Sequence, residues 1–242
     1  MKRLVFISDD RCAAARSAAT ELINEGYDVV INRLGGPEVS GTRPVTLNLS
    51  DFTALDTFFA SCGEAFHAVI HPAPPPIRVS IADATDAQWQ EAFDQGAQAS
   101  MQITRAAGKY LKELGRGAII YLGSIHSEKP MGYGFLHSMS LAATSMLCRE
   151  AALDFGRYNV NCIHVQRGVY EEDMVNKSDL SNVYSSPATR YPRQRMPEPR
   201  SLSGLLTFLL TEAASPLNGA DLRADEGMTM FYGHMKDEEA PE

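Results

Sequence analysis

Several features that would narrow the function of this 242-residue sequence are scarce or absent. No stretch approaches the about 18 consecutive apolar residues of a membrane-spanning helix, and the apolar run from Leu4 is too short for a signal peptide. The four cysteines, Cys12, Cys62, Cys148 and Cys162, have no spacing typical of a zinc site or a disulfide framework. Basic residues number 22 against 30 acidic ones, a formal net charge of −8, so no basic face for nucleic acid is evident. We therefore expect a cytoplasmic protein with neither a membrane nor a nucleic-acid partner.

What the sequence does have is a regular alternation of apolar strands and helical stretches. Strands are expected at residues 5–7, 27–32, 45–49, 68–70, 118–122, 160–165 and 220–224. Helices are expected between them, at residues 13–25, 52–59, 86–114, 139–153 and 202–210. This cadence predicts an α/β fold with a doubly wound parallel sheet. We expect a single Rossmann-like domain over residues 1–235, with an irregular segment at 169–200, and an acidic tail at 236–242.

The stretch from residue 123 to residue 168 organises the chain. The strand before it stops at Gly123 and Ser124, a long helical stretch follows, and residues 160–165 form a return strand. Such a βαβ unit puts Ser124 at the carboxyl end of a strand, where open α/β sheets place their binding sites. Ser124 is therefore a candidate catalytic residue.

This stretch resembles the short-chain dehydrogenase/reductase family. The family pattern is a serine, then Tyr-x-x-x-Lys about a dozen residues later, then Pro-Gly after the next strand. Without gaps, Ser124 stands at the serine, His137 at the tyrosine and Leu141 at the lysine, and Arg167-Gly168 falls on Pro-Gly. The resemblance covers nearly the whole chain and implies the family's single-domain fold, with residues 169–200 as a lid over the substrate.

The first turn departs from the family's dinucleotide-binding pattern, Thr-Gly-x-x-x-Gly-x-Gly. Asp9, Ala13 and Ala15 replace its three glycines, whose absence of a side chain lets backbone amides approach a pyrophosphate. We expect the methyl groups to crowd the phosphates and the carboxylates to repel them, and therefore no cofactor-binding residues and no cofactor. The alternative is that Arg11 and Arg16 compensate and a nucleotide still binds.

Other positions that the resemblance assigns to the cofactor and to catalysis are also changed. Asn48 replaces an aspartate near the adenine, and Gly96 replaces the asparagine of the family's catalytic tetrad. Of that tetrad only Ser124 remains. Tyr133 is no substitute for the missing tyrosine, because its use would add four residues to the gapless distance to Gly168.

The histidines leave two interpretations open. A histidine can serve as a general base near neutral pH, so Ser124 and His137 are candidate catalytic residues, for example as an acyl-transfer pair. In the second interpretation, Ser124 and His137 are vestigial residues in a pocket that has no function. His71 and His126 are expected near the mouth of the same pocket as His137. The spacing of the three histidines matches no familiar metal site, and no metal is expected.

These replacements predict a catalytically silent subunit and no active oxidoreductase. The resemblance implies a tetramer, made with itself or with a cofactor-competent family member, through the helices that flank the serine strand and the apolar residues 227–232. Heteromeric family members with one silent subunit are similar, such as 2-(hydroxybenzyl)succinyl-CoA dehydrogenase, an NAD-dependent acyl-CoA dehydrogenase complex. The arginines of the expected lid would suit a phosphate-bearing substrate of that kind; they are Arg190, Arg193, Arg195 and Arg200.

Two alternatives remain open. The first is a non-redox enzyme on the same fold, because residues 156–161 resemble the return strand of halohydrin dehalogenases, which also lack the glycine turn. Those enzymes depend on Ser, Tyr and Arg, and His137 and Leu141 occupy the last two of these places. The second is a sensor that binds a small molecule in the vacated groove.

Overall fold

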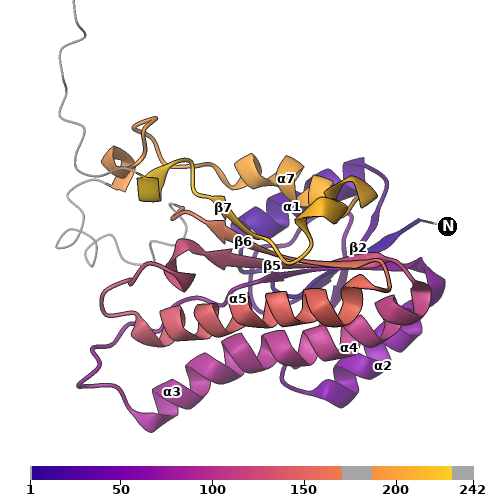
Figure 1. The fold of residues 1–242 in the computed structure, drawn as a ribbon, viewed down its shortest axis with the longest axis horizontal. Coiled ribbons are helices and arrows are strands. Elements are labelled where there is room, and N and C mark those ends of the chain that lie inside the picture. Colours follow the sequence, from indigo (N-terminus) through magenta and orange to yellow (C-terminus); the bar gives the residue numbers. More distant parts are fainter. Residues whose placement is uncertain (1, 171–186, 231–242) are drawn as a thin grey trace, which may run out of the picture.

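The computed structural model describes residues 2–170 and 187–230, and Figure 1 shows them as one parallel sheet between two layers of helices. The sheet has seven strands in the order β3-β2-β1-β4-β5-β6-β7. The strands are β1 (Leu4–Ile7), β2 (Asp28–Asn32), β3 (Arg43–Val45), β4 (Phe66–Pro72), β5 (Gly117–Ser124), β6 (Val160–Arg167) and β7 (Asp221–Ala224). All neighbouring pairs are parallel, which confirms the predicted doubly wound α/β fold.

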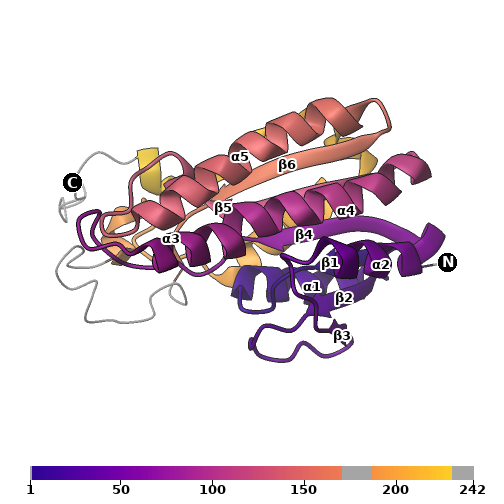
Figure 2. The same ribbon diagram turned by 90° about the horizontal axis from the view of Figure 1, so that it is seen from below.

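The helices cover both faces of the sheet. They are α1 (Ala13–Asn24), α2 (Phe52–Cys62), α3 (Asp86–Phe93), α4 (Ala99–Leu114), α5 (Phe135–Gly156) and α7 (Ser203–Leu209). Helices α1 and α7 pack on one face, and α2, α4 and α5 pack on the other. Figure 2 shows α4 and α5 running side by side beneath β5 and β6.

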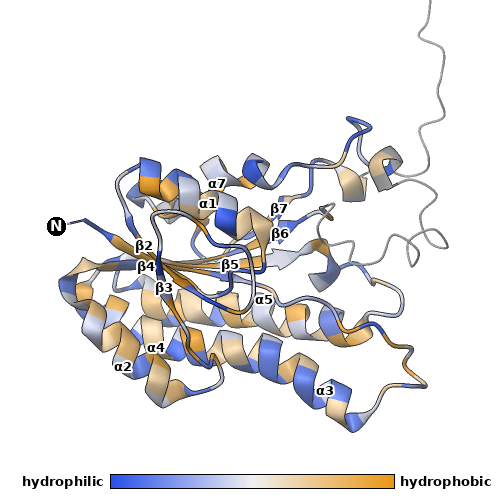
Figure 3. Ribbon diagram, turned by 180° about the vertical axis from the view of Figure 1, so that it is seen from behind, coloured by the Kyte–Doolittle hydropathy of each residue, from blue (hydrophilic) through white to orange (hydrophobic). Residues whose placement is uncertain are grey.

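The central strands are apolar along their whole length because helices bury both of their faces. Along β5, Ile120 and Leu122 point into the core beneath α1 and α7, whereas Ile119 and Tyr121 point into the core beneath α4 and α5. Figure 3 shows the consequence, a strongly hydrophobic sheet between helices that carry both polar and apolar faces.

Two expected elements differ from the structure. The predicted strand at 45–49 is instead Arg43–Val45, because beyond it the Asn32 side chain pairs with the backbone of Leu47, donating at 3.2 Å and accepting at 2.7 Å. The single helix predicted at 86–114 is divided by a π-helical segment, η2 (Asp94–Gln98), between α3 and α4. A π segment inside a helix often marks a functional site.

Some predictions fall outside the described residues. These are the centre of the expected lid, residues 171–186, and the apolar side chains Phe231 and Tyr232 with the acidic tail. Within the described residues, no helix is long and apolar enough to cross a bilayer.

Helices α4 and α5 approach each other closely because α4 has a glycine at their contact. A Cβ atom on Gly108 would lie 2.4 Å from the Phe155 ring of α5, far inside van der Waals contact. The glycine therefore permits the close approach of the last turn of α5, the helix that carries His137 in its first turn.

We expect Gly108→Ala to lower the free energy of unfolding by about 1–3 kcal/mol, because the methyl group overpacks the helix contact. The matched control is Gly204→Ala in α7, where the added Cβ meets nothing within 4 Å. That change should be neutral or stabilise the protein by up to about 1 kcal/mol, because alanine favours a helix over glycine. Urea unfolding of both variants measures the difference. Equal stability of the two variants would contradict the predicted close contact.

Candidate functional site

The candidate site lies at the carboxyl ends of the strands, where the strand order reverses between β1 and β4. Two cavities meet there. The first, here called the groove, has a volume of about 280 Å³ and is bordered by Asp9, Arg11, Leu34, Asn48, His71 and Asp94. The second, here called the inner pocket, has a volume of about 10 Å³ and is bordered by His71, Gly96, Ser100, His137, Ser140 and Thr144. His71 borders both cavities.

The first turn holds its own ion pair at the end of β1. The Arg11 guanidinium donates to both oxygens of Asp9, at 2.7–3.1 Å, and the Arg11 amide donates to Asp9 Oδ1 at 2.8 Å. The Asp9 side chain is 5% exposed and that of Arg11 is 32% exposed. The carboxylate hydrogen bond raises the pKa of Arg11, which therefore stays charged beside the groove.

The second carboxylate of the turn is also paired. Asp10 Oδ2 lies 2.9 Å from Arg33 Nε, and Asp10 Oδ1 accepts the Leu34 amide hydrogen at 2.7 Å. Arg33 follows β2, so this ion pair ties the ends of β1 and β2 together. A buried carboxylate with a guanidinium and an amide as partners is no longer an unbalanced charge.

A third guanidinium lies beside the turn. Arg16, in α1, donates to the carbonyl oxygens of Asp10 at 2.7 Å and Arg11 at 2.8 Å. The three guanidiniums offset the two carboxylates of the turn and the carboxylate of Asp94, which also borders the groove. The groove therefore has no excess of negative charge from these residues.

The predicted steric obstruction is also wrong. Ala15 is fully buried in the core between α1 and the sheet, and its methyl group does not border the groove. Ala13 borders a different surface cavity, beside Arg16 and Pro199. The Ala15 methyl group lies in the core because it faces the sheet, whereas Ala13 borders that other cavity and not the groove.

The groove fits a nucleotide, although by a different means from a glycine turn. Two turn amides are already engaged, since Asp10 donates to the Asn32 carbonyl and Arg11 to Asp9. Arginine side chains are the remaining donors, and guanidiniums bind phosphate well. The apolar walls at Leu34 and Leu49, with the polar Asn48 between them, suit a nucleoside.

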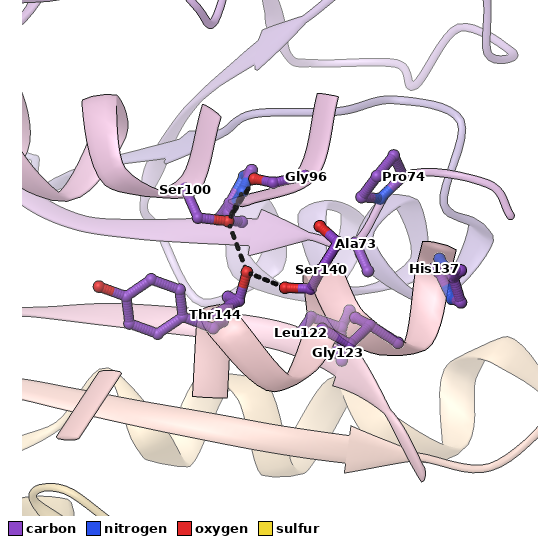
Figure 4. A pocket seen from close by; sticks show the side chains of 12 residues that line it. Ala73, Pro74, Gly96, Ser100, Leu122, Gly123, His137, Ser140 and Thr144 are labelled. Carbon is purple, nitrogen blue, oxygen red and sulfur yellow. Dashed lines mark hydrogen bonds between the residues drawn. The ribbon is translucent and has the colours of Figure 1, made fainter. Parts of the chain in front are cut away.

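Three of the four residues at the family's tetrad positions border the inner pocket, and Figure 4 labels two of them, Gly96 and His137. His137 is in the first turn of α5, and Gly96 is in the π segment η2 opposite it. A Cβ atom on Gly96 would lie within 1.9 Å of Ser140 Oγ, so the glycine makes room for this α5 hydroxyl. Leu141, at the lysine position, is buried and lines the pocket with an apolar side chain.

The structure brings together some of the predicted residues and separates others. Ser124 ends β5 beside Gly123, which borders the inner pocket with His137, and Ser124 Oγ accepts the His126 amide hydrogen at 3.4 Å. The His126 ring instead contacts the Lys129 carbonyl oxygen at 3.0 Å. Among residues 2–170 and 187–230, no group of three His, Cys, Asp or Glu side chains could hold a metal ion.

Sequence reasoning missed the hydroxyl groups of the inner pocket. Ser140 and Thr144 are four residues apart on α5 and both are buried, as is Ser100 on α4. Hydroxyl residues at helical spacing on an otherwise apolar buried face are the signal that identifies them. Arg33 was missed as well, and its position directly after a strand was the corresponding signal.

Comparison with known proteins places the chain in a family. A family model described as enoyl-(acyl carrier protein) reductase matches residues 13–229. The chain belongs to the short-chain dehydrogenase/reductase family. The 3-oxoacyl-(acyl-carrier-protein) reductase MabA of Mycobacterium tuberculosis is 23% identical, over 97% of this chain and 95% of its own length.

Further similar proteins have related names. The L-rhamnose 1-dehydrogenase (NAD(P)(+)) of Azotobacter vinelandii is 26% identical, over 93% of this chain and 96% of its own length. A gluconate 5-dehydrogenase from Burkholderia cenocepacia, solved in complex with NADP and tartrate, has a TM-score of 0.86 and 18% identity, covering 96% of this chain and 97% of that one. This last likeness shows the fold.

The prediction of a catalytically silent subunit is wrong. The family members that match nearly the whole chain are dehydrogenases and reductases, and these matches favour oxidation–reduction over the non-redox chemistries that the sequence left open. The physical reason for the error is that sequence reasoning counted Asp9 and Asp10 without their guanidinium partners.

The burial of His71 predicts a pH dependence of stability. Desolvation lowers the pKa of His71 from 6.5 to about 4, and the nearby Asp9 carboxylate opposes this only in part. The unfolded chain thus takes up a proton at His71 near pH 6.5, whereas the folded protein does so only near pH 4. This contribution to the free energy of unfolding is fully present above pH 6.5 and is lost as the pH falls. The loss amounts to about 3 kcal/mol at pH 4.

We expect His71→Gln to flatten the fall in stability between pH 6.5 and pH 4. Burial also lowers the pKa of His67, which remains in both proteins, so the difference between them isolates His71. Urea unfolding at pH 7, 5.5 and 4.5 provides the measurement. Parallel pH profiles for the two proteins would show that His71 is not held neutral.

Proposed function

We propose that this protein is a nicotinamide nucleotide-dependent oxidoreductase that interconverts a hydroxyl and a carbonyl group on a small substrate. The observation that carries the proposal is the position of His137, a titratable side chain in a pocket that shares His71 with a groove suited to a nucleotide. The dehydrogenases and reductases that match nearly the whole chain support the same reaction class.

Different residues of the groove would bind the phosphate and the nucleoside of the nucleotide. Arg11, partly exposed at the groove, would pair with a phosphate, while Arg16 and Arg33 offset the carboxylates of the turn. Leu34 and Asn48 would contact the nucleoside. A nicotinamide nucleotide bound there would supply or accept the hydride.

The proton is handled by this chain's own side chains. An imidazole donates or accepts a proton near neutral pH, so His137 gives a proton to the substrate oxygen in reduction and takes it back in oxidation. Ser124 already accepts the His126 amide hydrogen, so its own hydroxyl hydrogen can be directed to the substrate oxygen. His137 thus takes the place of the tyrosine, with an imidazole as the general acid and base.

We expect His137→Phe to lower turnover by about 10²-fold or more, because the proton donor is lost. Nucleotide affinity should remain unchanged, since His137 does not border the groove. Tyr133→Phe is the control; this tyrosine is close in sequence and exposed, and its loss should leave turnover unchanged. Nicotinamide absorbance reports the reaction with a panel of 3-oxoacyl thioesters, sugars and polyols, chosen from the substrates in the relatives' names.

No turnover of any member of the panel, with either nucleotide, would count against the proposed function. Full activity of His137→Phe in an otherwise active protein would instead remove His137 from its role while leaving the reaction class in place.

We also propose that the chain associates with further copies of itself through the outer faces of α4 and α5. Large apolar side chains are exposed along these helices, with Leu153 79% and Met146 52% exposed on α5, and Met101 on α4. An apolar surface of this kind is typical of an interface.

Light scattering of the purified protein should give a mass above that of one chain. The double variant Met146→Asp, Leu153→Asp should reduce it to a monomer with an unchanged circular dichroism spectrum. Ile81→Asp, on the loop before α3, is the control for an equally exposed apolar side chain. A monomeric wild-type protein would disprove the association.

A further inference from the structure

The segment directly after β5 folds into a tight turn around Ser124. A short 3₁₀ helix, η3 (Ile125–Ser127), follows this serine, and residues 124–129 are here called the serine turn. The His126 amide donates to Ser124 Oγ at 3.4 Å, and Ser127 Oγ donates to the Ser124 carbonyl oxygen at 3.0 Å. The conformation of the serine turn therefore influences the direction in which the Ser124 hydroxyl points.

A single carboxylate joins the far end of the serine turn to the next two strands of the sheet, which Figure 1 shows beside β5. Glu128 Oε1 accepts a hydrogen bond from Gln166 Nε2, in β6, at 2.8 Å. Glu128 Oε2 accepts one from Arg223, in β7, also at 2.8 Å. Gln166 and Arg223 are paired neighbours in the sheet, so their side chains leave it on the same face and reach one carboxylate together. These two hydrogen bonds are here called the clamp.

The two halves of the clamp differ in strength because their surroundings differ. Gln166 is 2% exposed, whereas the side chains of Glu128 and Arg223 are 43% and 36% exposed. An exposed ion pair stabilises a protein little, but a buried amide that loses its acceptor is costly. The hydrogen bond from Gln166, helped by that from Arg223, lowers the pKa of Glu128 despite desolvation, so the side chain is a carboxylate near pH 7. The bond to Gln166 is thus the stronger half.

Apolar packing anchors the start of the serine turn, and the clamp anchors its end. Ile125, directly after Ser124, is buried, whereas Glu128 and Lys129 are exposed. Without the clamp, less would oppose unwinding of the exposed end. The His126 amide would then no longer be held against Ser124 Oγ.

We infer that Glu128 is a positioning residue for Ser124. By joining the serine turn to β6 and β7, it keeps the Ser124 hydroxyl in the orientation from which its hydrogen can be directed to the substrate oxygen. The inference rests on the proposed function, because Glu128 acts in the reaction only through Ser124.

The position of the serine turn can be measured without any substrate. In ¹⁵N-labelled protein, Glu128→Ala should shift the amide signal of His126 and make its hydrogen exchange at least about tenfold faster, because the turn opens more often. Glu128→Gln should have a smaller effect, since its amide oxygen still accepts from Gln166. The matched control is Asp56→Ala, which removes another partly exposed ion pair, with Lys109 on α4, and should leave the His126 amide unchanged.

An unchanged His126 amide in Glu128→Ala would overturn the inference, whatever activity the protein has. If Glu128→Ala does not fold, Arg223→Gln serves instead, because it removes only the exposed half of the clamp and leaves Gln166 bonded. The His126 amide should again shift and exchange faster, and an unchanged amide in that variant would equally overturn the inference.

In the active enzyme, Glu128→Ala should lower turnover about tenfold to a hundredfold, because a displaced catalytic group reacts more slowly. KM for the nucleotide should stay the same, since Glu128 does not border the groove. In a Ser124→Ala background, Glu128→Ala should cause no further loss, because a residue that acts through the Ser124 hydroxyl has no effect once that hydroxyl is gone.

Equal fold-losses from Glu128→Ala in the presence and absence of the Ser124 hydroxyl would contradict the positioning role. If no substrate is turned over but the His126 amide responds as expected, only the proposed function fails.

Discussion

The pairing of two buried carboxylates with guanidiniums is the interaction on which the candidate site depends. Asp9 and Asp10 occupy the turn after β1, where the fold directs α1 and its backbone dipoles toward a ligand. Left unpaired at this depth, each carboxylate would cost several kcal/mol. Arg11 and Arg33 remove that cost, and Arg16 adds a positive charge, so the turn that has lost its glycines is still suited to an anion.

The other half of the site follows from the close approach of α4 and α5. Glycines at 96 and 108 let the two helices meet, and the space that the family gives to asparagine and lysine is filled by Ser140, Thr144 and Leu141. Buried hydroxyl groups in place of a charged lysine avoid a desolvated charge. The two halves share His71, which borders both the groove and the pocket of His137.

Much of the fold could be predicted from sequence, because strand and helix periodicity is local and the central strands are apolar throughout. The predicted strand 45–49 was displaced because a long-range partner, the Asn32 side chain, engages Leu47. The site was harder to predict. Register predicted Ser124, which ends β5, and His137, which lies in the first turn of α5, as candidates. The charge of the first turn depends on Arg33, which is distant in sequence and adjacent only in the folded sheet.

The directions in which side chains point could not be predicted from the sequence either. Ala15 replaces a glycine of a binding motif, yet its methyl group lies in the core and not in the groove. Which way an alanine points depends on how α1 packs on the sheet, and spacing alone does not specify that. Residue identities at motif positions therefore predicted a lost site, whereas the packed structure shows the two carboxylates of the turn paired with guanidiniums.

Calorimetric titration with NADH and NADPH tests the central claim most directly, because it measures whether arginines replace the glycine turn. The account predicts saturable binding of at least one nucleotide with a Kd below about 100 μM, equivalent to about −5.5 kcal/mol. It also predicts at least tenfold weaker binding by Arg11→Ala, and no change in Arg43→Ala, whose surface ion pair with Asp28 is remote from the groove. No binding of either nucleotide at millimolar concentration, or equal affinity of wild type and Arg11→Ala, would contradict the account.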